Sequence, residues 1–385
     1  MRPDLRHAAI ALAGVSTFLN LYAPQAVLPL LAQEFAVGPA QVGLTVTATT
    51  LAIALVAPFM GAVADVLGRK RIIAAAMLAL TVPTVGVALA PTLEIMIAWR
   101  FVQGILLPPV FAVAITYIGE EWPPAESTGV TGIYFSAASF GGFLGRFLTG
   151  VMADWVGWRG AFLADAALTL ACAIGVVFLL PRERRFVRAS NLAAAIAQML
   201  RHLRNRQLLA TYLVGFGVLF NFIAVFTYVN FLLAAPPFNL SAALLGSIFV
   251  VYLAASFVTP LTGRAVQRFG RRRFVLTVLA VWGCGLALTL VPSLPMIIGG
   301  LAVISATGFL CQSSATSYVA TTARDGASTA VGLYVTFFYV GGSVGGALGG
   351  AAWSYGGWPA VVAMAAAMLG ALAAIVARVW PPAAR

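Results

Sequence analysis

Two stretches of this sequence repeat one pattern, and that pattern determines the fold. The first reads Gly61-Ala-Val-Ala-Asp65-Val-Leu-Gly68-Arg69-Lys70-Arg71, and the second reads Gly263-Arg-Ala-Val-Gln267-Arg-Phe-Gly270-Arg271-Arg272-Arg273. The copies begin about 200 residues apart in a chain of 385 residues. Self-similarity at half the chain length indicates two copies of one structural unit.

A set of glycines repeats at nearly the same spacing. The first set is Gly132, Gly141, Gly145, Gly150 and Gly157, and it returns as Gly332, Gly341, Gly345, Gly350 and Gly357. Small residues three to four apart let helices approach closely. We expect the stripes around Gly141 and Gly145, and around Gly341 and Gly345, to pack at the interface between the two halves.

The composition predicts a membrane protein. The chain is 61% hydrophobic and 9% charged, whereas soluble domains carry about 25% charged residues. Apolar stretches long enough to cross a bilayer recur along the whole chain. We predict twelve spans, at residues 7–31, 39–63, 72–91, 93–118, 127–152, 159–180, 207–234, 241–264, 272–292, 294–322, 327–353 and 357–380.

The spans predict an all-α membrane protein of two pseudo-symmetric six-helix bundles. The first bundle covers residues 1–180, a basic linker covers 181–206, and the second bundle covers 207–385. Residues 191–200 within the linker have helical character, so we expect a short interfacial helix there. The first span is too long for the core of a signal peptide, so we expect it to be retained.

The net charge of +12 is not spread evenly along the chain but follows the predicted membrane topology. With the N-terminus in the cytoplasm, all but three of the 23 Lys and Arg lie on the cytoplasmic side; the exceptions are Arg100, Arg146 and Arg159. This imbalance follows the positive-inside rule. It predicts cytoplasmic termini and linker, and it favours contact with anionic lipid over binding of nucleic acid.

These features resemble the major facilitator superfamily. Its signature motif between spans 2 and 3 is matched by Gly61, Asp65, Gly68, Arg69 and Lys70, although Val66 replaces the usual basic residue. Arg100-Phe-Val-Gln103-Gly104 resembles the span-4 motif. The resemblance implies a monomeric secondary transporter in a bacterial inner membrane.

The fifth span narrows the resemblance to one branch. Gly132, Gly141 and Gly145 have the spacing of the motif of the proton-coupled drug antiporters, but Arg146 stands where that motif has proline. The stretch is similar to the twelve-span drug:proton antiporter or YnfM-like branch. The departure at Arg146 weakens the case for an antiporter.

Three ionisable residues fall inside spans. Such residues are costly in a bilayer and usually face a cavity or a partner. Arg146 and Asp165 lie on consecutive spans, nine and ten residues from Trp155, so we expect a buried ion pair that is either static or a protonatable switch. Arg100, with Gln103 one turn on, either contacts an anionic substrate or anchors span 1 near Asn20 or Gln25.

Polar side chains in four spans are candidates for lining a substrate cavity, because polar groups avoid lipid. They are Asn20, Tyr22 and Gln25 in span 1, Arg100 and Gln103 in span 4, Asn221, Tyr228 and Asn230 in span 7, and Gln312 in span 10.

The signature motif implies a conformational switch at the cytoplasmic side. By analogy with the family, Asp65 accepts hydrogen bonds from the start of span 11 near Ser328, where exposed helix amides favour a carboxylate. Arg69 or Arg71 reaches Glu120 or Glu121. Such contacts are expected to hold the outward-open state and to break on the inward swing.

We predict a secondary active transporter that exports a drug-like or metabolite compound in exchange for protons. The alternative is a carrier for an organic anion or sugar-like metabolite that uses Arg100. An enzyme is not expected, because no catalytic constellation is visible. We expect no cofactor and no metal, since His7 and His202 are far apart and Cys172, Cys284 and Cys311 lie in separate spans.

Overall fold

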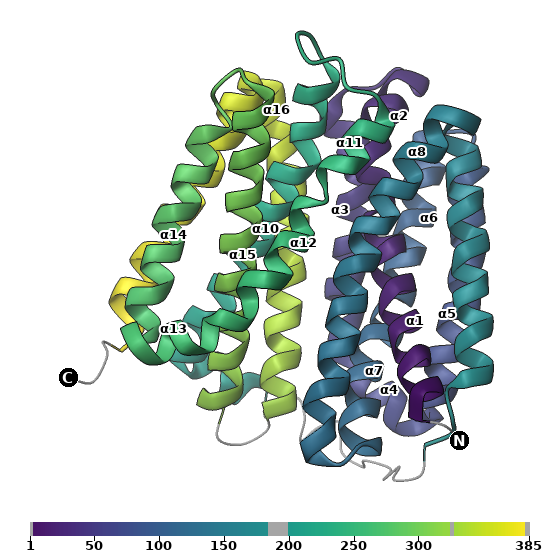
Figure 1. Ribbon diagram of the computed structural model, residues 1–385, viewed down its shortest axis with the longest axis vertical. Helices are drawn as coiled ribbons and strands as arrows, with labels where there is room; N and C mark the ends of the chain where they lie inside the picture. Colours follow the sequence, from purple (N-terminus) through teal and green to yellow (C-terminus); the bar gives the residue numbers. More distant parts are fainter. Residues whose placement is uncertain (1–2, 184–198, 324–326, 382–385) are drawn as a thin grey trace. The chain divides into compact units, whose positions relative to one another are not determined.

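The computed structural model describes residues 3–183, 199–323 and 327–381. Figure 1 shows helices joined by short connections, and these three ranges contain no strand. The prediction of an all-α membrane protein is therefore confirmed. Most of the predicted interfacial helix, residues 191–198, lies outside the described residues.

The chain divides into two compact units. The first unit comprises Met1–Gly38, Leu44–Ser190 and Asn239–Phe249, and the second comprises Pro39–Gly43, Asn191–Phe238 and Val250–Arg385. Each unit thus takes in the first residues of one span from the other half of the sequence. The predicted bundle boundaries at residues 180 and 207 stay predictions.

The helices of the first unit come from the first half of the chain, except for α11, which comes from the second half. They are α1 (Pro3–Tyr22), η1 (Ala23–Val27), α2 (Leu28–Glu34), α3 (Pro39–Val56, from Leu44 on), η2 (Ala57–Phe59), α4 (Met60–Leu67), α5 (Arg69–Ala88), α6 (Leu93–Leu106), α7 (Pro108–Glu121), α8 (Pro124–Leu179) and α11 (Ala242–Ile248). Apolar side chains from α1, α5, α7 and α8, such as Met77, Tyr117 and Val176, form its core.

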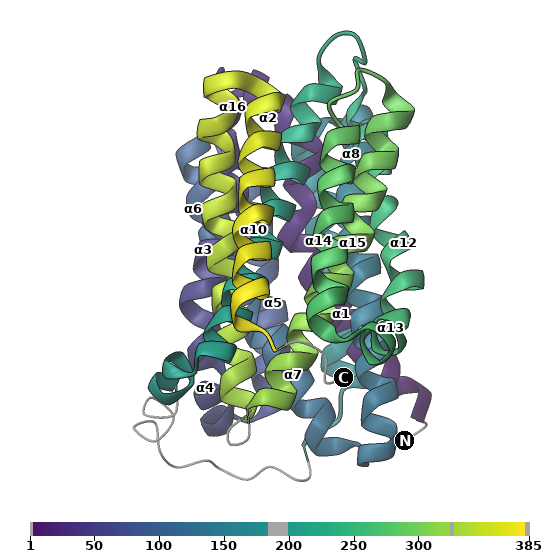
Figure 2. The same cartoon turned by 90° about the vertical axis from the view of Figure 1, so that its left-hand side faces the viewer.

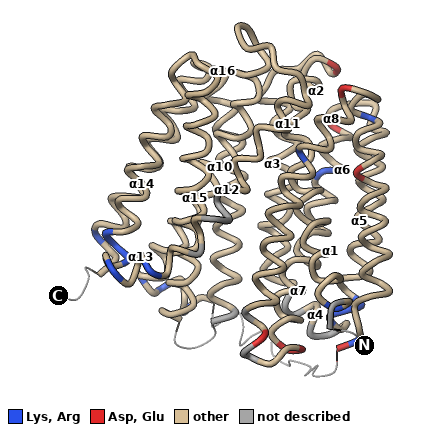
Figure 3. The backbone as a smooth tube through the Cα atoms, viewed as in Figure 1, with Lys and Arg blue, Asp and Glu red and all other residues tan. Residues whose placement is uncertain are grey.

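The second unit is built from fewer and longer helices. They are α10 (Arg206–Ala234), α12 (Val251–Val258), η3 (Thr259–Leu261), α13 (Thr262–Phe269), α14 (Arg271–Leu288), α15 (Leu294–Thr322) and α16 (Ala327–Val379). Figure 2 shows α16 turning back on itself at one end. Basic residues gather over α13 and the start of α14 (Figure 3).

The helices account for the twelve predicted spans. In the described ranges, eight helical stretches are long and apolar enough to cross a membrane. Two of these, Gly129–Leu179 and Thr329–Val379, contain 51 residues each and bend at Gly157 (φ 73°) and Gly357 (φ 61°), so each makes two crossings. The remaining two spans are the broken run from α11 to α13, and α14.

Prolines break four predicted spans. Pro108 begins α7, so span 4 is interrupted at Leu107. Pro58 lies in η2 and Pro260 lies in η3, at equivalent positions of the repeat. Pro24 lies in η1 and divides span 1, whereas the equivalent α10 is unbroken. A proline within a helix removes one N–H donor and displaces the preceding turn. The break at Pro24 shapes the site described below.

The glycine stripe of span 5 packs within the first unit. A Cβ at Gly141 would collide with the backbone of Val15, and a Cβ at Gly145 would collide with the backbone of Leu19. Small residues here allow α8 to approach α1 closely. Gly132 is different, because nothing lies within 4 Å of an added Cβ there.

The stripe of span 11 repeats this packing in the second unit. A Cβ at Gly341 would meet the backbone of Phe216, and a Cβ at Gly345 would meet the backbone of Phe220. Each stripe therefore packs against the first span of its own half, and a role at the interface between the two halves stays a prediction. The expected packing role of Gly132 is wrong.

These contacts predict opposite outcomes for two similar substitutions. Gly141→Val should lower the free energy of unfolding by at least about 3 kcal/mol, because overpacking against a rigid backbone cannot be relieved by side-chain movement. Gly132→Val should change it by less than about 1 kcal/mol, since the site is open. Thermal unfolding of both variants in detergent measures the difference. Equal stability of the two variants would contradict the packing.

Candidate functional site

Among the side chains that the structure describes in the first unit, those of Arg100, Arg146 and Asp165 are charged and buried well inside predicted spans. Arg100 is 0% exposed, Arg146 is 1% exposed and Asp165 is 0% exposed. An intramembrane ionisable residue is a candidate functional residue, and its partners decide what it can do.

Arg100, on α6, is held by four hydrogen bonds. Its Nη1 donates to the carbonyl of Asn20 at 2.7 Å, and its Nη2 donates to the carbonyl of Leu21 at 2.7 Å. Nε donates to the carbonyl of Thr45 at 3.1 Å, and Nη1 also donates to Oε1 of Gln103 at 2.6 Å. The guanidinium therefore ties α6 to the last residues of α1 and to α3.

The proline break in span 1 explains why an arginine binds here. Pro24 has no N–H, so the carbonyl of Asn20, four residues earlier, lacks its usual helical donor. In a bilayer no water replaces that donor. Arg100 supplies it from a neighbouring helix. The hydrogen bond to Asn20 is the one expected if Arg100 anchors span 1. The alternative, a contact between Arg100 and substrate, stays a prediction.

A chain of amides and hydroxyls continues from this arginine. Nε2 of Gln103 donates to Oγ1 of Thr84 at 2.8 Å, and Oγ1 of Thr84 donates to Oδ1 of Asn20 at 2.8 Å. Nδ2 of Asn20 donates to Oγ1 of Thr169 at 2.7 Å. All four side chains are buried. The network joins α1, α5, α6 and α8, and it brings together three predicted cavity residues, Asn20, Arg100 and Gln103.

Asp165 lies close to this network on the second arm of α8. Thr169 is one turn further along, so both side chains lie on the same face of the helix. Oδ2 of Asp165 accepts a hydrogen bond from Oγ1 of Thr149 at 3.0 Å. Oδ1 is buried and has no hydrogen-bond partner. A buried carboxylate oxygen without a partner is energetically costly.

The predicted ion pair between Arg146 and Asp165 is wrong. Arg146 makes its hydrogen bonds to other groups, and Asp165 bonds to Thr149 instead. The reason is the position of the bend. The chain reverses at Gly157, which lies eight residues from both Thr149 and Asp165. Arg146 is three residues further from the bend, about 4.5 Å along the helix.

Arg146 instead sits between two aromatic rings. Its guanidinium carbon lies 4.1 Å from the ring centre of Tyr22 and 4.4 Å from that of Phe249. Its Nε donates to Oε1 of Gln25 at 2.7 Å, and its Nη1 donates to the carbonyl of Gly142 at 2.7 Å. A cation stacked on aromatic faces is stabilised without a carboxylate. Tyr22 and Gln25, both predicted cavity residues, thus surround Arg146.

The predicted cavity residues of the second unit lie on α10 and α15. Asn221 is buried, and its Oδ1 has no hydrogen-bond partner. Tyr228 donates to the carbonyl of Gly346 at 2.8 Å, and Asn230 bonds to the carbonyl of Phe226 in its own helix at 2.7 Å. Gln312 on α15 is half-buried. These four side chains do not form a network like that of the first unit.

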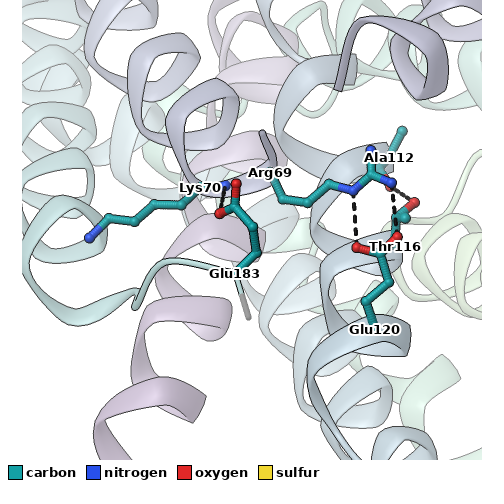
Figure 4. A network of polar contacts seen from close by, with 6 residues as sticks. All are labelled: Arg69, Lys70, Ala112, Thr116, Glu120 and Glu183. Carbon is teal, nitrogen blue, oxygen red and sulfur yellow. Dashed lines mark hydrogen bonds and ion pairs between the residues drawn. The ribbon is translucent and has the colours of Figure 1, made fainter. Parts of the chain in front are cut away.

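Charged residues of the signature motif form a cluster at one end of the first unit (Figure 4). Nε of Arg69 donates to Oε2 of Glu120 at 3.1 Å, and its Nη2 donates to Oε1 of Glu120 at 2.8 Å. This is a two-pronged arginine–carboxylate pair. Glu121 pairs with Arg6 at 3.9 Å instead. The structure describes neither the side chain of Asp65 nor that of Ser328, so the predicted contact at the start of span 11 stays a prediction.

Glu183 belongs to the same cluster and was missed in the sequence analysis. Its Oε2 accepts a hydrogen bond from the backbone N–H of Lys70 at 3.3 Å (Figure 4). This amide is at the start of α5, just after Gly68 (φ 89°), and helix starts attract carboxylates. The available signal was an acidic residue two positions after Pro181, at the start of a basic stretch.

No group of three or more His, Cys, Asp or Glu side chains that could hold a metal ion occurs among the residues that the structure describes. Cys172, Cys284 and Cys311 are free thiols.

Comparisons with known proteins agree along the whole chain. A family model described as Major Facilitator Superfamily matches residues 10–234 and 214–385. The chain is 32% identical to the inner membrane transport protein YnfM of Escherichia coli, covering 95% of this chain and 89% of that protein. It is 31% identical to the uncharacterized MFS-type transporter YybF of Bacillus subtilis, covering 93% and 89%.

Solved structures share the fold at low sequence identity. A crystal structure of the nucleoside transporter NupG has a TM-score of 0.81 and 14% identity, and it covers 98% of this chain and 100% of that chain. A D-xylose–proton symporter has a TM-score of 0.78 and 15% identity, and it covers 99% of both chains.

Proposed function

The chain belongs to the major facilitator superfamily, and on that premise we propose that it exports a small amphipathic molecule in exchange for protons. The family and its relatives make the chain a secondary transporter. Transport is then by alternating access, and the coupling proton binds at Asp165.

The observation that carries this proposal is the state of Asp165. It is a carboxylate well inside a predicted span, it is fully buried, and one of its oxygens is without a partner. Acidic side chains in such positions mark proton paths in pumps and transporters. A proton on Oδ1 would remove the negative charge and so relieve the cost of burying a carboxylate without a second partner.

Protonation of Asp165 has a route to the rest of the unit. Its Oδ2 is bonded to Thr149, on the arm of α8 that also carries Gly145 and Gly150. That arm packs closely on α1 and on α11, where a Cβ at Gly150 would collide with the backbone of Ala242. A change in the Thr149 bond therefore acts on helix contacts that must rearrange during transport.

The cytoplasmic cluster has a separate part in this proposal. The Arg69–Glu120 pair and the Glu183 contact join α5, α7 and the residues after α8. Together with Asp65, these contacts serve as the conformational switch. They stabilise the outward-open state and break when the transporter changes to the inward-open state. This role supports the transport cycle without substrate contact.

The organic-anion carrier remains the second candidate, and a specific observation favours it. Arg146 is a buried cation between Tyr22 and Phe249, an arrangement that also suits an aromatic carboxylate. Arg100 is less suited to this part, since its hydrogen bonds go to the chain itself.

One experiment separates the two candidates. Purified protein is screened by thermal shift against drugs, sugars and organic acids, and stabilising compounds are tested in proteoliposomes containing a pH-sensitive dye. Proton movement driven by an amphipathic compound supports the exchanger. Transport of an organic acid without opposite proton movement would reject it in favour of the anion carrier.

The topology gives a prediction that needs no substrate. In a cysteine-free background, Arg204→Cys should be labelled from the cytoplasmic side and Asn239→Cys from the outer side, because positive charge is retained inside. Both positions are exposed. Labelling with an impermeant maleimide in intact cells and in inverted vesicles measures this. Labelling of both sites from the same side would reject the twelve-span topology.

A further inference from the structure

The second copy of the signature pattern carries more positive charge than the first. It forms the corner between α13 and α14, residues 264–273, which we call the α13–α14 corner. The basic run 69–71 of the first copy returns as 271–273. Arg264 and Arg268 are additional, because the first copy has uncharged residues at their positions. Figure 3 shows this positive charge gathered at one end of the second unit.

The acidic residues that accompany the first copy are all missing from the second. At the spacing of about 200 residues that relates the copies, the counterparts of Asp65, Glu120 and Glu183 are Gln267, Thr322 and Ala383. Among the residues that the structure describes, the second unit contains no Asp or Glu. No described carboxylate therefore neutralises the α13–α14 corner.

Arg271 shows the consequence of this loss. Its counterpart Arg69 makes a two-pronged pair with Glu120. Nη1 of Arg271 donates instead to the carbonyl of Ser314 at 2.7 Å and to Oγ of Ser317 at 2.9 Å. These partners carry no charge, so the positive charge of Arg271 is not cancelled by them.

The other arginines of the corner repel one another. Arg264 and Arg268 are exposed and four residues apart on α13. Like charges at this spacing share one face of a helix and destabilise it. Arg272 and Arg273 lie in the first turn of α14, where the helix itself carries partial positive charge. An anion from outside the chain would relieve both effects.

The first copy shows that such a corner accommodates an anion. Gly68 and Gly270 have matching backbone conformations, with φ 89° and ψ 145° in one and φ 77° and ψ 143° in the other. After Gly68, Oε2 of Glu183 accepts a hydrogen bond from the N–H of Lys70 at 3.3 Å. The carbonyls at the end of the preceding helix therefore do not exclude an anion there. The equivalent N–H belongs to Arg272, whose acidic partner is absent from the second copy.

Exposed apolar side chains beside the arginines favour a lipid over a soluble anion. Leu261, just before α13, is 52% exposed, and Phe269, its last residue, is 54% exposed. A helix with basic and apolar residues is suited to the membrane interface. From this corner α14 runs into a predicted span, so the arginines lie where lipid headgroups are expected.

We propose that the α13–α14 corner binds the headgroup phosphate of an anionic phospholipid, which takes the place of the carboxylates in the first copy. Arg264, Arg268, Arg272 and Arg273 bind the phosphate, for which the planar guanidinium is well suited. This is a defined site and differs from the general attraction of basic loops to the membrane, since the corner of the first copy is neutralised by its own acidic residues.

The test measures binding of phosphatidylglycerol to the full-length protein in detergent by native mass spectrometry, with phosphatidylcholine as the neutral lipid. Replacing both Arg264→Gln and Arg268→Gln should weaken phosphatidylglycerol binding about tenfold or more, as expected for the loss of two arginines at an anionic headgroup. The matched control is Arg204→Gln with Arg206→Gln, which removes the same charge from exposed residues around the start of α10. It should change binding by less than about threefold.

Gln267→Glu tests the corner without removing an arginine. Gln267 is exposed, so this variant should fold normally. Its new carboxylate should compete with the phosphate for the arginines and weaken binding about fivefold. Equal weakening by the two arginine pairs, or unchanged binding in Gln267→Glu, would overturn the proposal. Equally tight binding of phosphatidylcholine, or displacement of the lipid by equimolar glycerol phosphate, would overturn it as well.

Discussion

Replacing Asp165 with asparagine is expected to abolish proton movement during transport while the protein stays folded. Asparagine has the shape of aspartate and can still accept a hydrogen bond from Thr149, but it cannot bind or release a proton. The free energy of unfolding should change by less than about 2 kcal/mol, since one buried contact at most is altered. Substrate exchange that needs no net proton transfer should continue.

The control for Asp165→Asn is the exposed carboxylate of Glu34. Glu34 pairs with Arg159 at 2.7 Å, and both side chains are more than 40% exposed, at 44% and 45%. Surface pairs contribute little to stability. Glu34→Gln should therefore leave both proton movement and folding unchanged. A loss of coupling in both variants would show that the effect is not specific to the buried carboxylate.

The largest loss of stability is expected for Arg100→Met. The substitution leaves the carbonyls of Asn20, Leu21 and Thr45 without this donor inside the bilayer. Each unsatisfied buried group costs about 1–3 kcal/mol, so the total loss should be at least about 3 kcal/mol. Reduced folded yield and a lower unfolding temperature in detergent measure the effect.

Arg100→Lys tests whether the anchor depends on the planar guanidinium. Lysine keeps the charge but cannot reach three carbonyls and Gln103 in the same fork. We expect partial recovery of folded yield and unchanged substrate affinity in the folded fraction. If Arg100→Met and Arg100→Lys both fold as well as wild type but lose substrate affinity, Arg100 contacts the substrate and does not anchor span 1. Arg159→Met serves as the exposed control.

The sequence predicted the membrane spans and the internal repeat because both depend on local composition. Apolar length determines where a helix crosses the bilayer. The repeat persists in atomic detail, since Gly141 packs on Val15 as Gly341 packs on Phe216. The packing of these glycines on the first span of their own half could not be predicted, because small residues predict close approach but do not identify the partner.

The partners of the buried charges could not be predicted from residue counts alone. A shift of three residues along α8 decided whether Arg146 or Thr149 faces Asp165, and this shift depends on the bend at Gly157. Arg100 binds at the end of α1 because Pro24 leaves the Asn20 carbonyl without a helical donor, and residue types alone do not predict this. Such effects arise from backbone geometry and from contacts between helices distant in sequence.

The central claim is that Asp165 carries the coupling proton. The most direct measurement is the pH change inside proteoliposomes when a transported compound from the screen is added, with wild type, Asp165→Asn and Glu34→Gln reconstituted in parallel. The account predicts compound-driven proton movement in wild type and Glu34→Gln, and none in Asp165→Asn, which still exchanges labelled for unlabelled compound. Undiminished proton movement in Asp165→Asn would contradict it.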